Sequence, residues 1–163
     1  MQLDDITIRT YLKPGDIGYV IYRHGALYQH ECSYGIAFES YVALGLHEFY
    51  RGYNPELDRV WVAEHQHKMV GFLLLLHRPG NTAQLRYFLI EPEYRGMGLG
   101  KKLMDLYMAF SRAKGYASSY LWTTHEQEAA IDLYKRYGFR LTEEKPSTAF
   151  GKPLTEQRYD LKV

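Results

Sequence analysis

Hydrophobic residues along the chain follow two different periods, and each period predicts one kind of element. Apolar positions spaced three or four residues apart predict four helices, over residues 17–27, 38–50, 99–114 and 126–137. Short apolar or alternating runs predict seven strands, over residues 6–11, 60–63, 69–76, 85–90, 119–123, 141–144 and 157–161. This order of elements predicts an α/β (α+β) fold, with a central mixed sheet of six or seven strands flanked by about four helices.

The residues within and between these runs refine the prediction. The run from Met69 to Leu76 is apolar throughout, which indicates a strand buried on both faces. A short turn around Gly80 separates it from the next strand, so the two strands should be antiparallel neighbours. We expect Asp16 to cap the first helix, Gly25 to weaken or bend it, and Gly115 to end the third.

Composition narrows the class of protein. The chain has 163 residues, 46% of them hydrophobic, and a net charge of +1. This length supports one core, and we expect a single domain over residues 1–163. A charge near zero gives no strong field toward nucleic acid or an acidic membrane, and no apolar run is long enough to span a bilayer. A single cysteine, Cys32, and an N-terminus without a signal-peptide pattern predict a reducing, cytoplasmic setting.

One stretch, from Ile90 to Leu103, carries the strongest chemical signal. It joins a predicted strand to a predicted helix through three glycines, with an arginine before them and two lysines after. The first N–H groups of a helix lack partners inside the helix, and the helix dipole adds partial positive charge there. Glycines let a ligand come close to the backbone. The pattern therefore predicts an anion-binding loop rather than an ordinary turn.

Two well-known phosphate loops do not match this stretch. A nucleoside-triphosphate loop needs Ser or Thr after Gly-Lys, but a second lysine, Lys102, follows here. A dinucleotide loop needs Gly-x-Gly-x-x-Gly in the first βαβ unit, whereas this loop reads Gly-x-Gly-x-Gly past the middle of the chain. The run Arg95-x-x-Gly98-x-Gly100, with Pro-Glu-Tyr before it, resembles instead the acetyl-CoA pyrophosphate loop of GCN5-related N-acetyltransferases, the GNAT family.

A second motif supports this resemblance. The family pattern Asn-x-x-Ala-x-x-x-Tyr-x-x-x-Gly-Phe matches Ala130, Tyr134, Gly138 and Phe139 in register, with Gln127 in place of the asparagine. The resemblance implies that Tyr134 protonates the departing CoA thiolate, and a phenol with an ordinary pKa of about 10 can serve this role. The alternative is that Tyr134 is only a packed aromatic on a buried helical face.

The resemblance also implies a mostly antiparallel twisted sheet and a cofactor, acetyl-CoA (coenzyme A). The backbone at the end of the strand before the loop would pair with the pantetheine arm as an added strand does. The N–H groups of the loop would hold the pyrophosphate, with Lys102 either a charge partner or part of a solvated helix face. The implied cofactor-binding residues are Phe88, Leu89, Ile90, Arg95, Gly96, Met97, Gly98, Leu99, Gly100, Lys101, Gln127 and Tyr134.

Further stretches resemble one subgroup of the family. Residues 15–28, 121–124 and 143–151 look like the acetyltransferase half of bacterial proteins that fuse a MarR-type winged-helix regulator to this domain. Our hypothesis is that such subgroup-specific sequence supplies the wall that contacts the acceptor. Its candidate residues are Arg23, His24, Tyr28 and the loop 147–151.

Other chemistry-bearing residues give weaker signals. No carboxylate stands on the strand before the glycine loop, so the general base is open. Candidates by residue type alone are Glu31, Glu64, Glu91 and His125. Cys32 fits a small buried hydrophobe better than a nucleophile. The pair His65-x-His67 is an incomplete ligand set, so we expect no metal.

The sequence thus leads to one function and one alternative. The first is an N-acetyltransferase, an acyltransferase that moves acetyl from acetyl-CoA to a primary amine of a small molecule or peptide by direct attack. The alternative is a catalytically weak acyl-CoA-binding sensor or regulatory module. A nucleotide-dependent enzyme is disfavoured by the loop spacing. We expect no nucleic-acid or membrane partner, while the identity of the acceptor and the formation of a homodimer stay open.

Overall fold

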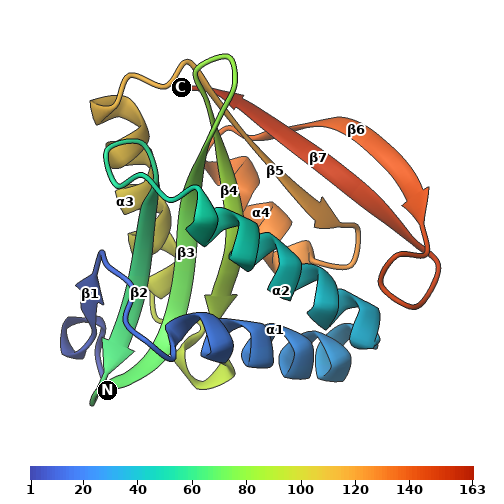
Figure 1. The fold of residues 1–163 in the computed structure, drawn as a ribbon, viewed down its shortest axis with the longest axis horizontal. Helices are drawn as coiled ribbons and strands as arrows, with labels where there is room; N and C mark the ends of the chain where they lie inside the picture. Colours follow the sequence, from blue (N-terminus) through green and yellow to red (C-terminus); the bar gives the residue numbers. More distant parts are fainter. The chain divides into compact units, whose positions relative to one another are not determined.

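The computed structural model describes all 163 residues, and its elements are drawn in Figure 1. The α-helices are α1 (Asp16–Cys32), α2 (Ile36–Arg51), α3 (Leu99–Ala113) and α4 (Glu128–Arg136). The strands are β1 (Thr7–Arg9), β2 (Arg59–His65), β3 (Lys68–Arg78), β4 (Thr82–Ile90), β5 (Ser118–Thr124), β6 (Arg140–Ser147) and β7 (Leu154–Lys162). Two short 3-10 helices are η1 (Leu3–Asp5) and η2 (Pro92–Tyr94). The element order and the α+β class, with a mixed, mostly antiparallel sheet, are confirmed.

The chain forms two compact units, and each is described on its own. The first comprises residues 1–16, 54–119 and 162–163, and the second comprises residues 17–53 and 120–161. Across both units, none of the helices is both long enough and apolar enough to cross a bilayer.

The first unit contains four antiparallel strands in the order β1-β2-β3-β4. The expectation for the middle of β3 is confirmed, since every residue from Met69 to Leu75 is buried. Strands β3 and β4 are antiparallel neighbours, as the short turn between them predicts. Helix α3 packs against this sheet through its apolar face (Figure 1), where the ring of Tyr107 lies 6.0 Å from that of Trp61.

Strand β4 contains a β-bulge shortly before the glycine loop. Its register with β3 shifts between Phe72 and Leu74, so two β4 residues, Tyr87 and Phe88, lie opposite Leu73 alone. Tyr87 has a left-handed backbone with φ of 59°. Bulges re-aim the residues that follow them, and such backbone outliers gather at functional sites. The last residues of β4, after the bulge, therefore pair with β3 in a different register from the rest of the strand.

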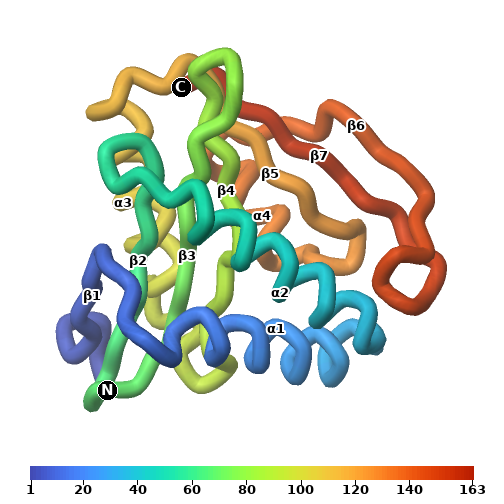
Figure 2. Tube along the Cα trace, in the orientation of Figure 1, coloured from blue at the N-terminus to red at the C-terminus, as the bar shows by residue number.

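The second unit contains α1, α2 and α4 together with three strands in the order β5-β7-β6. Gly25 does not interrupt α1, which runs unbroken from Asp16 to Cys32. A Cβ at Gly25 would lie only 2.2 Å from Oε1 of Glu39 on α2. Gly25 thus lets α1 and α2 approach closely, and they run beside each other in Figure 2 as the blue and teal coils.

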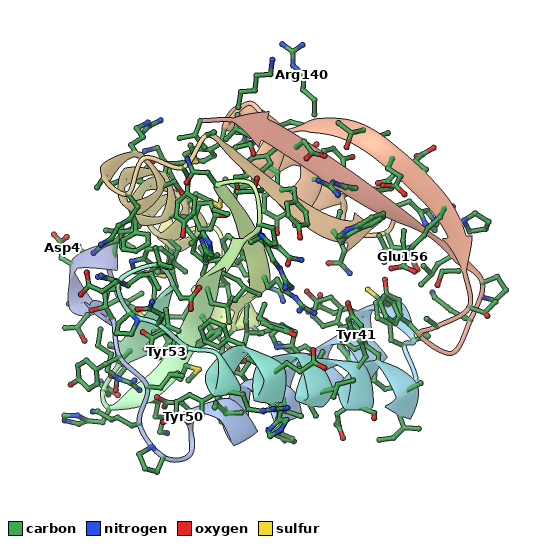
Figure 3. The ribbon with its side chains drawn as sticks, turned by 45° about the horizontal axis from the view of Figure 1, so that its top comes forward. Asp4, Tyr41, Tyr50, Tyr53, Arg140 and Glu156 are labelled. Atoms are coloured by element: carbon green, nitrogen blue, oxygen red, sulfur yellow. The ribbon has the colours of Figure 1, made fainter.

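Strands β6 and β7 form an antiparallel hairpin with β6 at its outer edge. Residues Arg140 to Pro146 are all exposed, and Figure 3 shows Arg140 projecting away from the ribbon. The predicted strand ended at Glu144, whereas β6 continues to Ser147. The strand tolerates Pro146 because an edge position does not need its missing N–H for a ladder bond.

Asp16 begins α1, but its carboxylate is used differently from a simple cap. It accepts bonds from the guanidinium of Arg9 at 2.7 and 2.9 Å and from the N–H of Lys13 at 2.6 Å. Arg9 also contacts Glu64 of β2. The start of α1 is therefore tied by an ion-pair network to β1 and β2 within the first unit.

Candidate functional site

The glycine loop joins β4 to α3 in the first unit. Gly98 is the N-cap of α3 with φ of 93°, and Gly96 has φ of 75°. Residues with a Cβ rarely adopt this left-handed backbone, so the turn from strand to helix needs glycine at both positions. The N–H of Lys102 donates to the Gly98 carbonyl at 3.0 Å, the first bond of α3. The N–H groups of the first turn precede this bond and face the loop.

The charges around the loop favour an anion. The first turn of α3 contains no acidic residue, so the partial positive charge of the helix N-terminus is not neutralised there. The Nε of Arg95 donates to the carbonyl of Ile90 at 3.1 Å, which folds this side chain back along the loop. Lys101 pairs with Asp105 at 2.8 Å, but the side chains are 72% and 51% exposed, so the pair is weak.

The loop has room for a phosphate group. A Cβ added at Gly96 would meet no atom within 4 Å, so the backbone is open on that side. Leu99 and Leu103 are buried and anchor the start of α3. Open glycine backbone, a helix N-terminus and nearby basic side chains are donors that hold phosphates in proteins. These residues therefore fit the pyrophosphate of coenzyme A.

The strand before the loop alternates in burial. Leu89 is buried, whereas Phe88 and Ile90 are half-buried, as is Met97 in the loop itself. The bulge at Tyr87 comes immediately before the three residues that the family resemblance assigns to the pantetheine arm. The structure therefore places the strand part and the loop part of the expected cofactor site next to each other in one unit.

In the second unit, Tyr134 lies on the buried face of α4. Its side chain is 5% exposed, and Ile131 on the preceding turn is buried as well. Its ring packs at 6.1 Å against Phe139 in a T-shaped arrangement. Its carbonyl accepts the N–H groups of Tyr137 at 3.0 Å and Phe139 at 3.2 Å, which closes the helix. The tyrosine is thus held in a fixed orientation, which a proton donor needs and a core aromatic also has.

Gln127 is the N-cap of α4, because the helix begins at Glu128 and not at residue 126 as predicted. Its Nε2 donates to Sγ of Cys32 at 3.1 Å, which links this segment to the end of α1. Burial raises the pKa of the Cys32 thiol, and the hydrogen bond from Gln127 opposes this only in part. A buried, protonated thiol is a poor nucleophile, in agreement with a packing role for Cys32.

Part of the hypothetical acceptor wall forms an aromatic cluster in the second unit. Tyr28 stacks on Tyr34 with 5.8 Å between ring centroids. Phe150, from the loop 147–151, packs on the other side of the cluster at 5.3 Å from Tyr34 and 4.9 Å from Phe38. The structure therefore brings Tyr28 and this loop to the same aromatic residues.

His24 and Arg23 take other positions. His24 is 3% exposed, donates through Nδ1 to the carbonyl of Val20 at 2.9 Å, and stacks on Tyr28. Burial lowers the pKa of His24 to about 4, so the ring is neutral at pH 7. His24 is therefore a buried residue of α1 that packs against the ring of Tyr28. The guanidinium of Arg23 lies over the ring of Tyr22, 5.6 Å from its centroid.

Of the four candidates for the general base, Glu31 is exposed near the end of α1, and the other three have contacts or burial that fit structural roles. Glu64 pairs with Arg9, and Glu91 is buried directly before η2 in the first unit. In the second unit, Nδ1 of His125 accepts the N–H of Thr155 at 3.2 Å. The geometry singles out none of these three as a base.

The histidine pair likewise has a local explanation. Nδ1 of His65 lies 2.8 Å from the hydroxyl of Tyr94, and His67 belongs to the turn between β2 and β3. No group of three or more His, Cys, Asp or Glu side chains is placed to hold a metal ion.

Sequence reasoning missed a polar cluster in the second unit. Lys152 donates to Glu126 at 2.7 Å, and the Tyr34 hydroxyl lies 2.5 Å from Oγ1 of Thr124. Three segments that are far apart in the sequence meet here. No motif marks them, and only the position of Glu126 beside the motif residue Gln127 could have drawn attention to it.

The fold and the loop together define a class: an α+β protein with an open glycine loop, at the N-terminus of a helix, that follows a bulged strand. The model of the Acetyltransferase (GNAT) family matches residues 19–139, well over half of the chain. The chain belongs to this family.

Several known proteins are similar to the chain. Human N-acetyltransferase 8B is 34% identical over 87 residues, which cover 50% of this chain and 38% of that protein. The chain thus spans little more than a third of that relative. An acetyltransferase from Streptococcus agalactiae 2603 has a TM-score of 0.76 at 20% identity, covering 99% of this chain and 100% of that one. A GNAT family acetyltransferase from Elizabethkingia anophelis, with acetyl-CoA bound, has a TM-score of 0.69 at 15% identity, covering 98% and 99%. These structures confirm the fold.

Proposed function

We propose that the chain is an acetyl-CoA-dependent N-acetyltransferase that transfers acetyl to a primary amine of a small molecule or peptide by direct attack. The observation that carries this proposal is the open glycine loop at the N-terminus of α3, directly after the bulged strand. Family membership supports it, and so does the bound acetyl-CoA of the E. anophelis protein. The family match includes parts of both units, which supports one domain over residues 1–163.

Acetyl-CoA would supply the activated acetyl thioester, and the chain would bind and orient it. The N–H groups from Gly96 to Lys101 hold the pyrophosphate, and Arg95 adds positive charge. The backbone of residues 88–90 pairs with the pantetheine arm in the manner of an added strand. Gln127 contributes its amide at the start of α4, where it now bonds to Cys32.

Tyr134 is the proposed general acid. When the amine attacks the thioester carbonyl, the C–S bond breaks and the thiolate needs a proton. The hydroxyl of Tyr134 donates it. The packing of the ring against Phe139 supports this role, because a donor must be held in one place for proton transfer to be efficient.

The acceptor would bind in the second unit beside Tyr28 and the loop 147–151. His24 contributes by fixing Tyr28, and Arg23 would contribute its positive charge. Residues 15–28 and 143–151, which include this wall, also carry the resemblance to the acetyltransferase half of regulator fusions. We propose that the chain is related to that subgroup. This relationship motivates the alternative function, an acyl-CoA sensor that binds the cofactor without transferring its acetyl group.

The experiment is a screen of amines with acetyl-CoA that measures thiol release. The panel contains a polyamine, an aromatic amine, amino acids and peptide N-termini. We expect Tyr134→Phe to lower turnover about 100-fold while acetyl-CoA affinity, measured by calorimetry, stays within twofold. Tyr137→Phe, at the C-cap of the same helix, is the control and should keep wild-type turnover.

Two results would contradict the proposal. Full activity of Tyr134→Phe would remove Tyr134 from the acid role. Tight acetyl-CoA binding without thiol release on any amine would favour the sensor.

A further inference from the structure

Glu126 has an unusual environment at the N-terminal side of α4. Its Oε2 accepts a hydrogen bond from Nζ of Lys152 at 2.7 Å. Its Oε1 is buried and has no hydrogen-bond partner. A buried carboxylate oxygen without a donor is costly, by about 1–3 kcal/mol or more. This oxygen would therefore be stabilised by a further N–H donor from a bound ligand.

Lys152 holds this carboxylate in place. Its ammonium also lies 5.7 Å from the ring centroid of Tyr34, so it is fixed from two sides. The loop that carries it is tied to the start of α2, because the N–H of Gly35 donates to the carbonyl of Phe150 at 2.9 Å. Phe150 itself is buried among aromatic rings. The orientation of Glu126 is thus set by a series of contacts within the second unit.

The other polar groups around Glu126 are already satisfied. Gln127 donates to Cys32, and Tyr34 pairs with Thr124. Burial is the main cause of the raised pKa of the Cys32 thiol and of the Tyr34 phenol, and the negative charge of Glu126 adds to both. Both groups therefore stay protonated near neutral pH. Glu126 is the group in this cluster with a buried polar atom that lacks a hydrogen-bond partner.

We propose that Oε1 of Glu126 binds the amine of the acetyl acceptor and takes its proton, so that Glu126 is the general base. This inference rests on the proposed function and adds to it the residue that activates the acceptor. Glu126 and Gln127 are consecutive, so the base would lie beside a residue expected at the cofactor. It would also precede the helix that carries Tyr134.

The proton balance of the transfer is complete with these groups. Glu126 takes one proton from the incoming ammonium and later releases it to water. The nitrogen lone pair forms the C–N bond, the C–S bond breaks, and the Tyr134 hydroxyl protonates the thiolate. The second proton lost by nitrogen restores Tyr134. One ammonium and one thioester give one amide, one thiol and one proton in solution.

The site also selects a class of acceptor. A carboxylate attracts an ammonium and can take up a proton from it, whereas an alcohol has no charge for it to attract. Lys152 shows that a primary ammonium fits against Glu126 and the face of Tyr34. The expected substrate is therefore a primary amine that arrives protonated.

The test compares Glu126→Gln with Lys152→Met, using the panel amine that wild type acetylates fastest. We expect Glu126→Gln to lower kcat/KM for the amine about 100-fold and to keep acetyl-CoA affinity within twofold. At low pH, kcat/KM of this variant should then decrease only in proportion to the fraction of the amine that is unprotonated in solution. Lys152→Met keeps the carboxylate, so we expect a loss below tenfold with the acidic limb of the pH profile still present.

The outcomes separate this inference from the proposed function. An active wild type with equal losses in both variants and an unchanged pH profile would show that Glu126 only forms an ion pair. Should Glu126→Gln not fold, Glu126→Asp decides: a slower enzyme with the wild-type acidic limb supports the base, and loss of that limb overturns it. A wild type that binds acetyl-CoA but acetylates no amine contradicts the proposed function itself.

Discussion

The glycine loop and the Glu126–Lys152 cluster are built in opposite ways. The loop is one continuous stretch of the first unit, and it offers mainly backbone N–H groups at the start of α3. The cluster takes side chains from the α1–α2 connection, the β5–α4 connection and the β6–β7 loop of the second unit. The difference teaches that a site made from local backbone can be identified in the sequence, whereas a site made from distant side chains cannot.

The same difference predicts how each region responds to substitution. Backbone donors persist when side chains change, so the loop should be sensitive mainly to an added Cβ at its glycines. The cluster depends on specific atoms at the ends of side chains, so it should be sensitive to single-atom changes. Three predictions test this contrast.

The largest effect is expected at Gly98. Gly98→Ala places a Cβ on a residue with φ of 93°, which costs about 1–2 kcal/mol in backbone strain and shifts the first turn of α3. We expect acetyl-CoA affinity to fall about 100-fold, or about 2.7 kcal/mol, by calorimetry.

Gly80→Ala is the matched control. Gly80 has a similar φ of 82° but lies in the turn between β3 and β4. It should lose stability to a similar degree and keep its affinity for acetyl-CoA. Equal loss of affinity in both variants would mean that strain, and not the loop itself, controls binding.

The sequence predicted most of the fold and the loop because their determinants are local. Periodicity located the four α-helices and the seven strands but not the two 3-10 helices, and Gly98 and Gly96 marked the loop. The β4 bulge could not be read from residues 85–90, because it depends on the register with β3. Similarly, Gly25 taken alone predicted a weak point in α1. In the structure, its missing Cβ leaves space for the side chain of Glu39 on α2, and the sequence does not show that contact.

A second effect concerns acid stability and should come from the second unit. Burial lowers the pKa of His24 to about 4, against an ordinary value of 6.5. Between these values the unfolded chain binds a proton that the folded chain does not, so stability falls as the pH is lowered through this window. From pH 7 to pH 5, His24 alone should reduce the free energy of unfolding by about 2 kcal/mol.

His24→Asn removes this titration and keeps a donor for the Val20 carbonyl. Urea unfolding at pH 7 and pH 5 measures the difference. The variant should lose less stability between the two pH values than wild type, and His47→Asn, at an exposed position of α2, should behave as wild type. An identical pH dependence in all three proteins would show that His24 is not the group responsible.

The proposed catalytic part of the site was only half accessible to sequence reasoning. Tyr134 and Gln127 belong to a motif within one helix and its start, so they could be named. Glu126 stands next to that motif but carries no signal of its own. Its proposed role depends on its contact with Lys152, whose loop is held against the α1–α2 connection by the bond from Gly35 to Phe150.

The smallest effect is expected from a single oxygen of the cluster. Tyr34→Phe removes the hydroxyl that pairs with Thr124, which is buried, and leaves Oγ1 of Thr124 without that partner. We expect a loss of about 1 kcal/mol in the free energy of unfolding, measured with urea. Adding Thr124→Val should recover part of this loss, because the two polar atoms are then removed together.

Tyr22→Phe, at an exposed ring, should stay within about 0.5 kcal/mol of wild type. If Tyr34→Phe were equally silent, the cluster would tolerate atomic changes as the loop does, and the contrast between the two regions would not hold.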